Sequence, residues 1–214
     1  MKNKVAIVLN GPIDSFLTGD IKNYAMVIAV DGGLNHLVKY NMEADFFIGD
    51  CDSVNEDALI YMETSDIDRI EYDVEKDKTD FELALEYVKE KCKIKKIDVF
   101  CALGGKTDHT MTVLNNVLAY SKDLDITVFG GQQAAKVLNE GDTLRVLNRY
   151  DVVSFSMVPV DEDVTVSIES AKWELDHKTV KKESSLLMSN KAMGEYALVT
   201  AHKNRAFVFT TLFL

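Results

Sequence analysis

The sequence predicts an α/β domain with a doubly wound, mostly parallel sheet and helices on both faces, followed by an all-β sandwich domain. The first part is predicted because, up to about residue 130, short apolar runs alternate with amphipathic stretches of helical period. The second is predicted because this helical period disappears after Gly130 and short β-branched or aromatic runs follow one another. We therefore expect an α/β domain at residues 1–132 and a β-sandwich domain at residues 133–214.

The first domain shows its alternation in six apolar runs and four helical patterns. The expected strands are 5–9, 25–30, 46–48, 68–72, 96–102 and 125–129. The expected helices are 34–41, 55–64, 79–92 and 108–121. In the third helix, one wide apolar face is formed by Phe81, Leu83, Ala84, Leu85 and Val88. Strands that alternate with helices in this way indicate βαβ units.

The second domain shows strand-like alternation instead. Val164, Val166 and Ile168 point to one side of an extended chain, and the residues between them point to the other. The expected strands are 136–140, 142–148, 152–160, 164–170, 195–201 and 206–214. Gly, Asp, Asn and Lys separate these runs, as is typical of a sandwich or small barrel.

Composition excludes several classes of partner and location. With 24 Lys and Arg against 35 Asp and Glu, the net charge of −11 argues against nucleic acid or an anionic membrane surface as the main partner. The three cysteines lack metal or disulfide spacing, which favours a reducing compartment. The first apolar run, Val5–Leu9, is too short for a signal segment, and no run approaches the ~20 residues of a membrane span. We expect a cytoplasmic protein.

Polar and glycine-rich clusters follow the expected strands one after another. They are NGP (10–12), DGG (31–33), GDCDS (49–53), EKDKTD (75–80) and LGGKTDH (103–109). In an open parallel sheet all strand carboxyl ends lie on one edge, and ligands bind in the crevice there. We therefore expect these clusters, distant in sequence, to converge on one cleft.

The GDCDS cluster is the candidate metal site. Asp50 and Asp52 are two residues apart in an extended segment, so they project to the same side. Mg²⁺ prefers oxygen ligands and commonly bridges one or two carboxylates to substrate phosphates. The alternative is that Asp52 or Ser53 simply caps the following helix, with Glu56 completing a capping box. Spacing alone leaves both open.

The EKDKTD and LGGKTDH clusters have the same two interpretations. Thr79 or Asp80 could merely begin a helix, but Asp77 and Asp80 would also add negative charge that favours a bound cation. Residues 103–109 lack the first glycine of a P-loop, although Gly104 and Gly105 would let backbone N–H groups and Lys106 approach a phosphate. The alternative is a turn capped by Thr107 or Asp108.

The DGG cluster and the single aromatic candidate are the weakest signals taken alone. Asp-Gly is a common turn, yet Gly32 and Gly33 open an expected helix whose N–H groups could face an anion. Trp173, the only tryptophan, is either a core residue or a platform for a cation. His36 and His109 lack metal-ligand spacing, which favours a surface or supporting role.

Taken together, the ordered motifs DGG, GDxDS, KDxTDFELAL and ALGGxxDH, with a Ser-Asn element in the second half, resemble the thiamine pyrophosphokinase family of bacterial type. The resemblance implies transfer of pyrophosphate from ATP to the hydroxyethyl group of thiamine, giving thiamine diphosphate and AMP, with Mg²⁺ required. It also implies a homodimer, in which the first domain binds ATP and Mg²⁺ and the second binds thiamine and takes part in dimerisation.

The resemblance implies three sets of site residues. The metal ligands would be Asp50, Asp52 and Asp80, and the catalytic carboxylates would be Asp52 and Asp80. The ATP-binding residues would be Asp31, Gly32, Gly33, Asp77, Lys78, Thr79, Gly104, Gly105, Lys106, Asp108 and His109. The thiamine-binding residues would be Trp173, Ser189 and Asn190. The chain departs from the family pattern at Cys51, Lys106, Leu187 and Lys191, and before Trp173.

Two other functions are compatible with the same motifs. One is a different Mg²⁺-dependent, nucleotide-using transferase, because a D-x-D pair after a strand also suits nucleotide-sugar chemistry. The other is a non-catalytic thiamine- or nucleotide-binding protein of the same fold. The number of clustered carboxylates disfavours the second, because a pure binder need not maintain so acidic a site.

Overall fold

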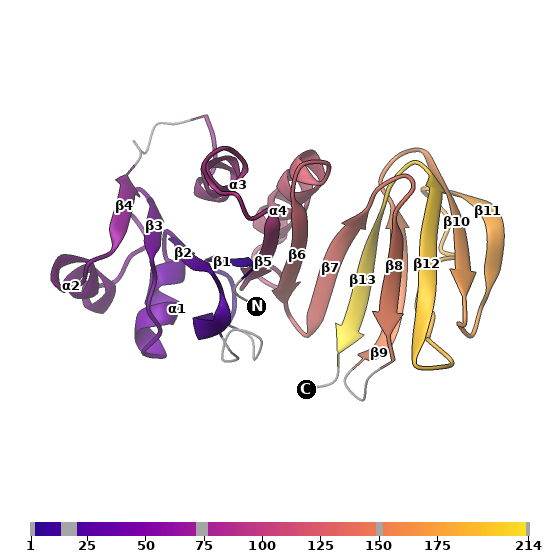
Figure 1. The fold of residues 1–214 in the computed structure, drawn as a ribbon, viewed down its shortest axis with the longest axis horizontal. Helices are drawn as coiled ribbons and strands as arrows, with labels where there is room; N and C mark the ends of the chain where they lie inside the picture. The colour runs from indigo at the N-terminus through magenta and orange to yellow at the C-terminus, as the bar shows by residue number, and fades with distance from the viewer. Residues whose placement is uncertain (1–2, 14–20, 72–76, 149–151, 213–214) are drawn as a thin grey trace. The chain divides into compact units, whose positions relative to one another are not determined.

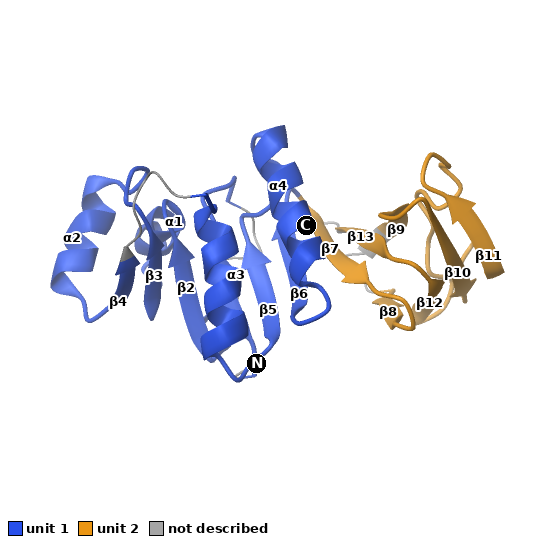
Figure 2. Ribbon diagram, turned by 90° about the horizontal axis from the view of Figure 1, so that it is seen from above, with its two compact units in different colours: residues 1–131 blue, residues 132–214 orange. Residues whose placement is uncertain are grey.

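The computed structural model describes residues 3–13, 21–71, 77–148 and 152–212. The chain divides into two compact units, residues 1–131 and 132–214, which are coloured separately in Figure 2. This division falls one residue before the boundary expected from the sequence. Each unit is described by itself below.

Unit 1 is built on six parallel strands in the order β4-β3-β2-β1-β5-β6. Their bounds are β1 Val5–Val8, β2 Met26–Val30, β3 Phe46–Gly49, β4 Asp68–Glu71, β5 Lys96–Phe100 and β6 Asp125–Gly130. The first four strands progress in one direction from β1, and β5 and β6 then lie on its other side. The strand order therefore reverses between β1 and β5, which is where ligands bind in doubly wound folds.

Helices cover both faces of this sheet, as Figure 1 shows: α1 and α2 lie on one face, and α3 and α4 on the other. Their bounds are α1 Gly33–Lys39, α2 Glu56–Thr64, α3 Asp80–Lys91 and α4 Thr107–Tyr120, with a short 3₁₀ helix at Ile21–Asn23. On the first face, Leu34 and Leu37 of α1 and Met62 of α2 pack with sheet residues such as Phe47. On the second, Leu85 and Val88 of α3 are fully buried.

The first residues of three helices test the N-cap residues suggested by the sequence. The suggestions for α2 and α4 are wrong, and the one for α3 is confirmed at Thr79. Asn55 caps α2, its side chain accepting from the N–H of Ala58 at 2.9 Å, so neither Asp52 nor Ser53 is the cap. Thr79 caps α3, as expected, by accepting from the N–H of Glu82. The N-cap position of α4 is Lys106, which makes no side-chain cap, whereas Thr107 already lies inside the helix.

Unit 2 is a sandwich of two antiparallel sheets, with strand orders β7-β13-β9 and β11-β10-β12-β8. The strands are β7 Gln133–Leu138, β8 Thr143–Leu147, β9 Val152–Pro159, β10 Asp163–Glu169, β11 Leu175–Lys181, β12 Tyr196–Lys203 and β13 Ala206–Leu212. Inward residues such as Phe155, Val166 and Val208 form one core. Figure 1 labels the strands of both sheets.

These units confirm the predicted fold class, an α/β domain followed by an all-β sandwich. Strand β11 was not predicted from the sequence. It lies at the edge of its sheet and is mostly exposed, so its sequence, LDHKTVK, has no apolar alternation. Among the described residues, no helix combines the length and apolar character needed to cross a bilayer.

Candidate active site

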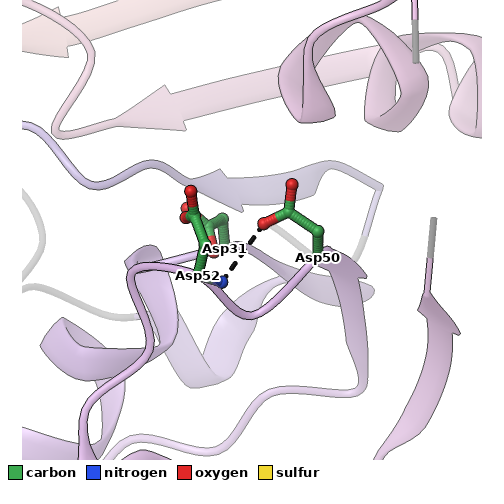
Figure 3. A group of neighbouring side chains, drawn as sticks. All are labelled: Asp31, Asp50 and Asp52. Carbon is green, nitrogen blue, oxygen red and sulfur yellow. Dashed lines mark hydrogen bonds between the residues drawn. The ribbon is translucent and has the colours of Figure 1, made fainter. Parts of the chain in front are cut away.

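Three aspartates meet at the carboxyl edge of the unit 1 sheet. Asp31 directly follows β2, and Asp50 and Asp52 follow the neighbouring strand β3. One carboxylate oxygen from each lies within 4.8 Å of the others, and this is the group of metal-ligating type found among the described residues. Figure 3 shows the three side chains facing the same small volume. We call Asp31, Asp50 and Asp52 the carboxylate group.

Backbone geometry brings these side chains together. The N–H of Asp31 donates to the carbonyl of Ile48 at 2.9 Å, which ties the end of β2 to the end of β3. Asp31 and Cys51 have left-handed backbone conformations, with φ of 47° and 67°, so the chain turns sharply at both places. A Cβ at Gly49 would lie only 3.1 Å from the Cα of Asp31, so a glycine allows this close approach.

The carboxylate group receives two hydrogen bonds and leaves one buried oxygen of Asp31 without a donor among the described residues. The hydroxyl of Ser53 donates to Oδ2 of Asp31, and the N–H of Asp52 donates to Oδ1 of Asp50 at 3.1 Å. Oδ1 of Asp31 is buried and has no hydrogen-bond partner within the described part of the chain. The negative charges of Asp31 and Asp50 raise the pKa of the Asp52 carboxyl above its ordinary value.

These features fit a hard divalent cation. A buried carboxylate oxygen without a donor is costly, and so is like-charge crowding, and a cation would relieve both. The donor set consists of carboxylate oxygens, which suits Mg²⁺ better than softer transition metals. The residues present therefore fit the metal expected from the sequence. The third carboxylate of the group is Asp31, however, whereas the resemblance implied Asp80 as the third metal ligand.

The start of α3 holds the EKDKTD residues that the structure describes. Asp80 is the first residue of α3, is half-buried, and is not a member of the carboxylate group as found in the described residues. Lys78 forms an ion pair with Glu86 at 2.8 Å, and this hydrogen bond raises the pKa of Lys78. Thr79 also accepts from the amide of Asn116 on α4 at 3.3 Å, and Asp77 is exposed. Glu75 and Lys76 lie outside the described residues.

The loop between β5 and α4 is open to solvent. Gly104 adopts φ 86°, which favours glycine, and the residues from Gly104 to His109 are all exposed. No side chain caps α4, so the backbone N–H groups of its first turn can donate hydrogen bonds to another group. Lys106 stands at this helix end, where its charge adds to the positive end of the helix dipole.

The DGG glycines have a steric reason as well. Gly32 occupies the N-cap position of α1, and Gly33 is the first residue of that helix. A Cβ at Gly33 would overlap the carbonyl oxygen of Val8 at the end of β1. Glycine therefore lets α1 start directly against the strand where the sheet order reverses.

In unit 2, the expected thiamine-binding residues lie beside one another. The segments at 171 and 192 are joined by a β-bridge, and a second bridge joins Phe155 to Asn190. Asn190 is only 4% exposed; its side chain accepts from the N–H of Trp173 at 3.1 Å and donates to the carbonyl of Trp173 at 2.7 Å. Asn190 therefore holds the backbone of Trp173 in place.

The other two members of this set are exposed. The Trp173 side chain is 53% exposed, and the ammonium of Lys172 lies 4.5 Å from its ring centroid. Ser189 adopts φ 58°, and its N–H donates to the hydroxyl of Ser156. Leu187, one of the departures from the family pattern, is a buried member of the sandwich core, which explains its apolar character.

Sequence reasoning missed Asn35 in α1; for its neighbour His36 the sequence favoured a surface or supporting role. The amide of Asn35 bonds to the backbone of the loop that carries Asp50 and Asp52, and Nε2 of His36 bonds to the carbonyl of Gly11 at 2.9 Å. The only sequence signal was the presence of two polar residues soon after DGG, in a helix that is otherwise largely apolar.

Comparison of the sequence with known proteins identifies the same family. The family model "Thiamin pyrophosphokinase, catalytic domain" matches residues 19–129, just over half of the chain. The curated thiamine pyrophosphokinase of Bacillus subtilis is 27% identical over 199 residues, covering 87% of this chain and 88% of that protein.

Solved structures agree in fold. The crystal structure of the Bacillus subtilis thiamine pyrophosphokinase matches with a TM-score of 0.88 and 21% identity, over 99% of this chain and all of that one. The thiamin pyrophosphokinase of Geobacillus thermodenitrificans matches with a TM-score of 0.85 and 24% identity, over 97% of both chains. The yeast enzyme matches with a TM-score of 0.82 and 15% identity, over 99% and 86%.

Proposed function

The chain belongs to the thiamin pyrophosphokinase family, and on that premise we propose that it transfers a pyrophosphoryl group from ATP to the hydroxyethyl oxygen of thiamine. The products are thiamine diphosphate and AMP. The observation that carries this proposal is the carboxylate group at the carboxyl edge of a parallel sheet, with the buried Oδ1 of Asp31 lacking a donor in the described chain. All three of its residues lie within the segment that matches the catalytic-domain model.

Asp31, Asp50 and Asp52 would hold Mg²⁺. When bound, Mg²⁺ would supply positive charge that offsets the negative charge of the ATP phosphates during transfer. The resemblance adds Asp80 to this set, and the proximity of Asp31 to Asp50 and Asp52 supports Asp31 as a ligand.

The transfer itself requires one bond to form and one to break. The hydroxyl oxygen of thiamine attacks the β-phosphorus, and the bond from that phosphorus to the oxygen bridging to the α-phosphorus breaks. The electron pair leaves with AMP, and the hydroxyl proton passes to a carboxylate. Asp52 is the first candidate for this role, because it lies in the carboxylate group that would hold Mg²⁺ beside the phosphates. Asp80, at the start of α3, is the second candidate.

The loops on the same edge of the sheet would bind ATP. Support comes from the exposed Lys106 and from the first turn of the 14-residue helix α4, which has no side-chain cap and can donate N–H groups to an anion. The remaining residues proposed to line the nucleotide and phosphate site are Asp31, Gly32, Gly33, Asp77, Lys78, Thr79, Gly104, Gly105, Asp108 and His109. Because Lys78 is paired with Glu86, it would have to exchange that partner to touch a phosphate.

Thiamine would be bound by Trp173 and Ser189, with Asn190 holding the backbone of Trp173. The ring of Trp173 already carries the Lys172 ammonium near its face, which supports its use as a platform for the thiazolium cation. The negative charge is also placed to suit a cationic substrate: residues 1–131 hold 14 Lys and Arg against 24 Asp and Glu. In line with the family, the active form would be a homodimer.

A single assay tests the proposal. The protein is incubated with ATP, Mg²⁺ and thiamine, and the nucleotides and thiamine species are separated by chromatography. The proposal predicts equal amounts of AMP and thiamine diphosphate, and neither product when Mg²⁺ is chelated. Release of ADP, or of UDP from a nucleotide sugar, would instead indicate another transferase. Tight binding of thiamine without any ATP-dependent product would indicate a non-catalytic binder.

A further inference from the structure

We propose that Asn35 is a positioning residue that fixes the acidic loop, defined as residues 50–55, so that Asp50 and Asp52 stay close to Asp31. This inference rests on one part of the proposed function, namely that the carboxylate group binds a divalent cation. It concerns how the chain holds three like charges together before any cation arrives.

The contacts of Asn35 are two well-formed hydrogen bonds to one loop. Its Nδ2 donates to the carbonyl of Ser53 at 2.9 Å, and its Oδ1 accepts from the N–H of Asn55, also at 2.9 Å. The carboxamide therefore uses a donor and an acceptor at once, on backbone groups that are 18 and 20 residues away in sequence. A side chain with only one of these functions cannot replace it.

The loop needs such support because it leaves the sheet at once. β3 ends at Gly49, so Ser53 and Asn55 have no strand to pair their backbone groups with. Asp52 and Asp50 repel one another and Asp31, and this repulsion would open the loop if nothing held it. Asn35 bonds the loop at two points, one on each side of Val54.

The place of Asn35 in the chain supports the same role. Asp31 accepts the first backbone bond of the turn that leads into α1, and Asn35 lies in the same helix, four residues on. The turn after β2 thus supplies a carboxylate of the group, and the helix that follows it supplies the amide that bonds to the loop of the other two.

The adjacent residue offers a matched control. His36 lies in the same helix and also bonds to a backbone carbonyl, that of Gly11 after β1, at 2.9 Å. Replacing it disturbs α1 in a comparable way but leaves the bonds to the acidic loop intact. The pair Asn35→Ala and His36→Phe therefore separates support of the acidic loop from general support of the helix. Asn35→Ser, whose hydroxyl is too short to span both backbone groups, serves if the alanine variant does not fold.

The experiment measures cation binding without turnover. Free Mn²⁺ is followed by electron paramagnetic resonance as each folded protein is added, with Mn²⁺ standing in for Mg²⁺. We expect Asn35→Ala to raise the dissociation constant by about 10-fold or more, the usual effect of losing a group that orients metal ligands. His36→Phe should leave it within about twofold. In the product assay, the Mg²⁺ requirement of Asn35→Ala should rise while its turnover at saturating Mg²⁺ changes less.

Each outcome decides the matter. An unchanged dissociation constant in the Asn35 variants, or equal weakening in His36→Phe, would overturn the positioning role. Failure of the wild type to bind Mn²⁺ would overturn it together with the metal site. If the wild type binds Mn²⁺ but forms no thiamine diphosphate, the proposed reaction fails while the comparison between Asn35 and His36 still decides the role of Asn35.

Discussion

In unit 1, Asp98 and the carboxylate group differ in the partners that surround their side chains. Asp98 on β5 is 3% exposed, and it accepts hydrogen bonds from the ammonium of Lys4 at 2.8 and 2.9 Å and from the hydroxyl of Tyr24 at 2.6 Å. In the carboxylate group, by contrast, three aspartates face one another and Oδ1 of Asp31 has no partner that the described residues supply. Burial and the bond to Asp98 also raise the pKa of Tyr24, which keeps it a donor.

The difference separates a structural carboxylate from a functional one. Where the fold requires a buried aspartate, the segments that lead into β1 and β2 supply a cation, Lys4, and a donor, Tyr24, as natural proteins do for buried charges. Where three carboxylates are crowded together, a bound cation would offset their mutual repulsion. We therefore expect substitutions at the two places to affect different properties.

The largest expected effect is on turnover in Asp52→Asn. Loss of the proposed base and metal ligand should lower turnover by about 10²- to 10⁴-fold. The melting temperature without metal should stay the same or rise, because one of three repelling charges is removed. Product formation at saturating Mg²⁺ and thermal unfolding measure the two effects. Asp123→Asn, which loses only a surface ion pair with Lys89, is the control and should stay active. Near-wild-type turnover in Asp52→Asn would contradict the assignment.

The opposite result is expected at Asp98. Asp98→Asn removes the charge that pairs with Lys4 and weakens the bond from Tyr24, so the free energy of unfolding should fall by about 2–3 kcal/mol. Urea unfolding measures this loss. The folded fraction should keep its Mg²⁺ dependence, since Asp98 is not part of the carboxylate group. A variant as stable as the wild type, or one with an altered Mg²⁺ requirement, would break the contrast between the two places.

The smallest expected effect is on the pH dependence of stability. The folded protein holds the pKa of Asp52 above its ordinary value of 3.8, so Asp52 stabilises the metal-free fold while protonated. That contribution is fully present below pH 3.8 and is lost as pH rises through the raised pKa. Asp161, whose pKa is lowered by Arg205, contributes in the opposite direction and loses its stabilising effect as pH falls. The stability difference between wild type and Asp52→Asn, measured from pH 3 upward, should therefore grow with pH; a flat difference would contradict this.

Much of the fold could be predicted from local pattern. The alternation of buried runs with helical faces predicted every strand and α-helix described in unit 1, but not the short 3₁₀ helix at Ile21–Asn23. The strands were predictable because parallel strands are buried on both faces and their sequences are apolar runs. The edge strand β11 could not be predicted, since an exposed edge needs no apolar alternation. The cap of α2 was misplaced because Ser53 and Asn55 are both good capping residues, and the choice depends on how the acidic loop bends.

The candidate site was predictable only in part. Asp50 and Asp52 stand two residues apart, so their proximity is a local property. The proximity of Asp31 depends on the pairing of β2 with β3 and on a left-handed turn at Asp31 itself, neither of which sequence spacing encodes. The bonds of Asn35 depend on the same pairing. Long-range contacts of this kind need the tertiary structure.

We infer that Asp31 completes a metal site with Asp50 and Asp52. Its most direct test is the change in melting temperature on adding Mg²⁺ to metal-free wild type and to Asp31→Asn. We expect a clear increase for the wild type, because a ligand that binds only the folded state stabilises it, and little or no increase for Asp31→Asn. An equal increase in both proteins would contradict this inference, because it would show that the cation does not bind the carboxylate of Asp31.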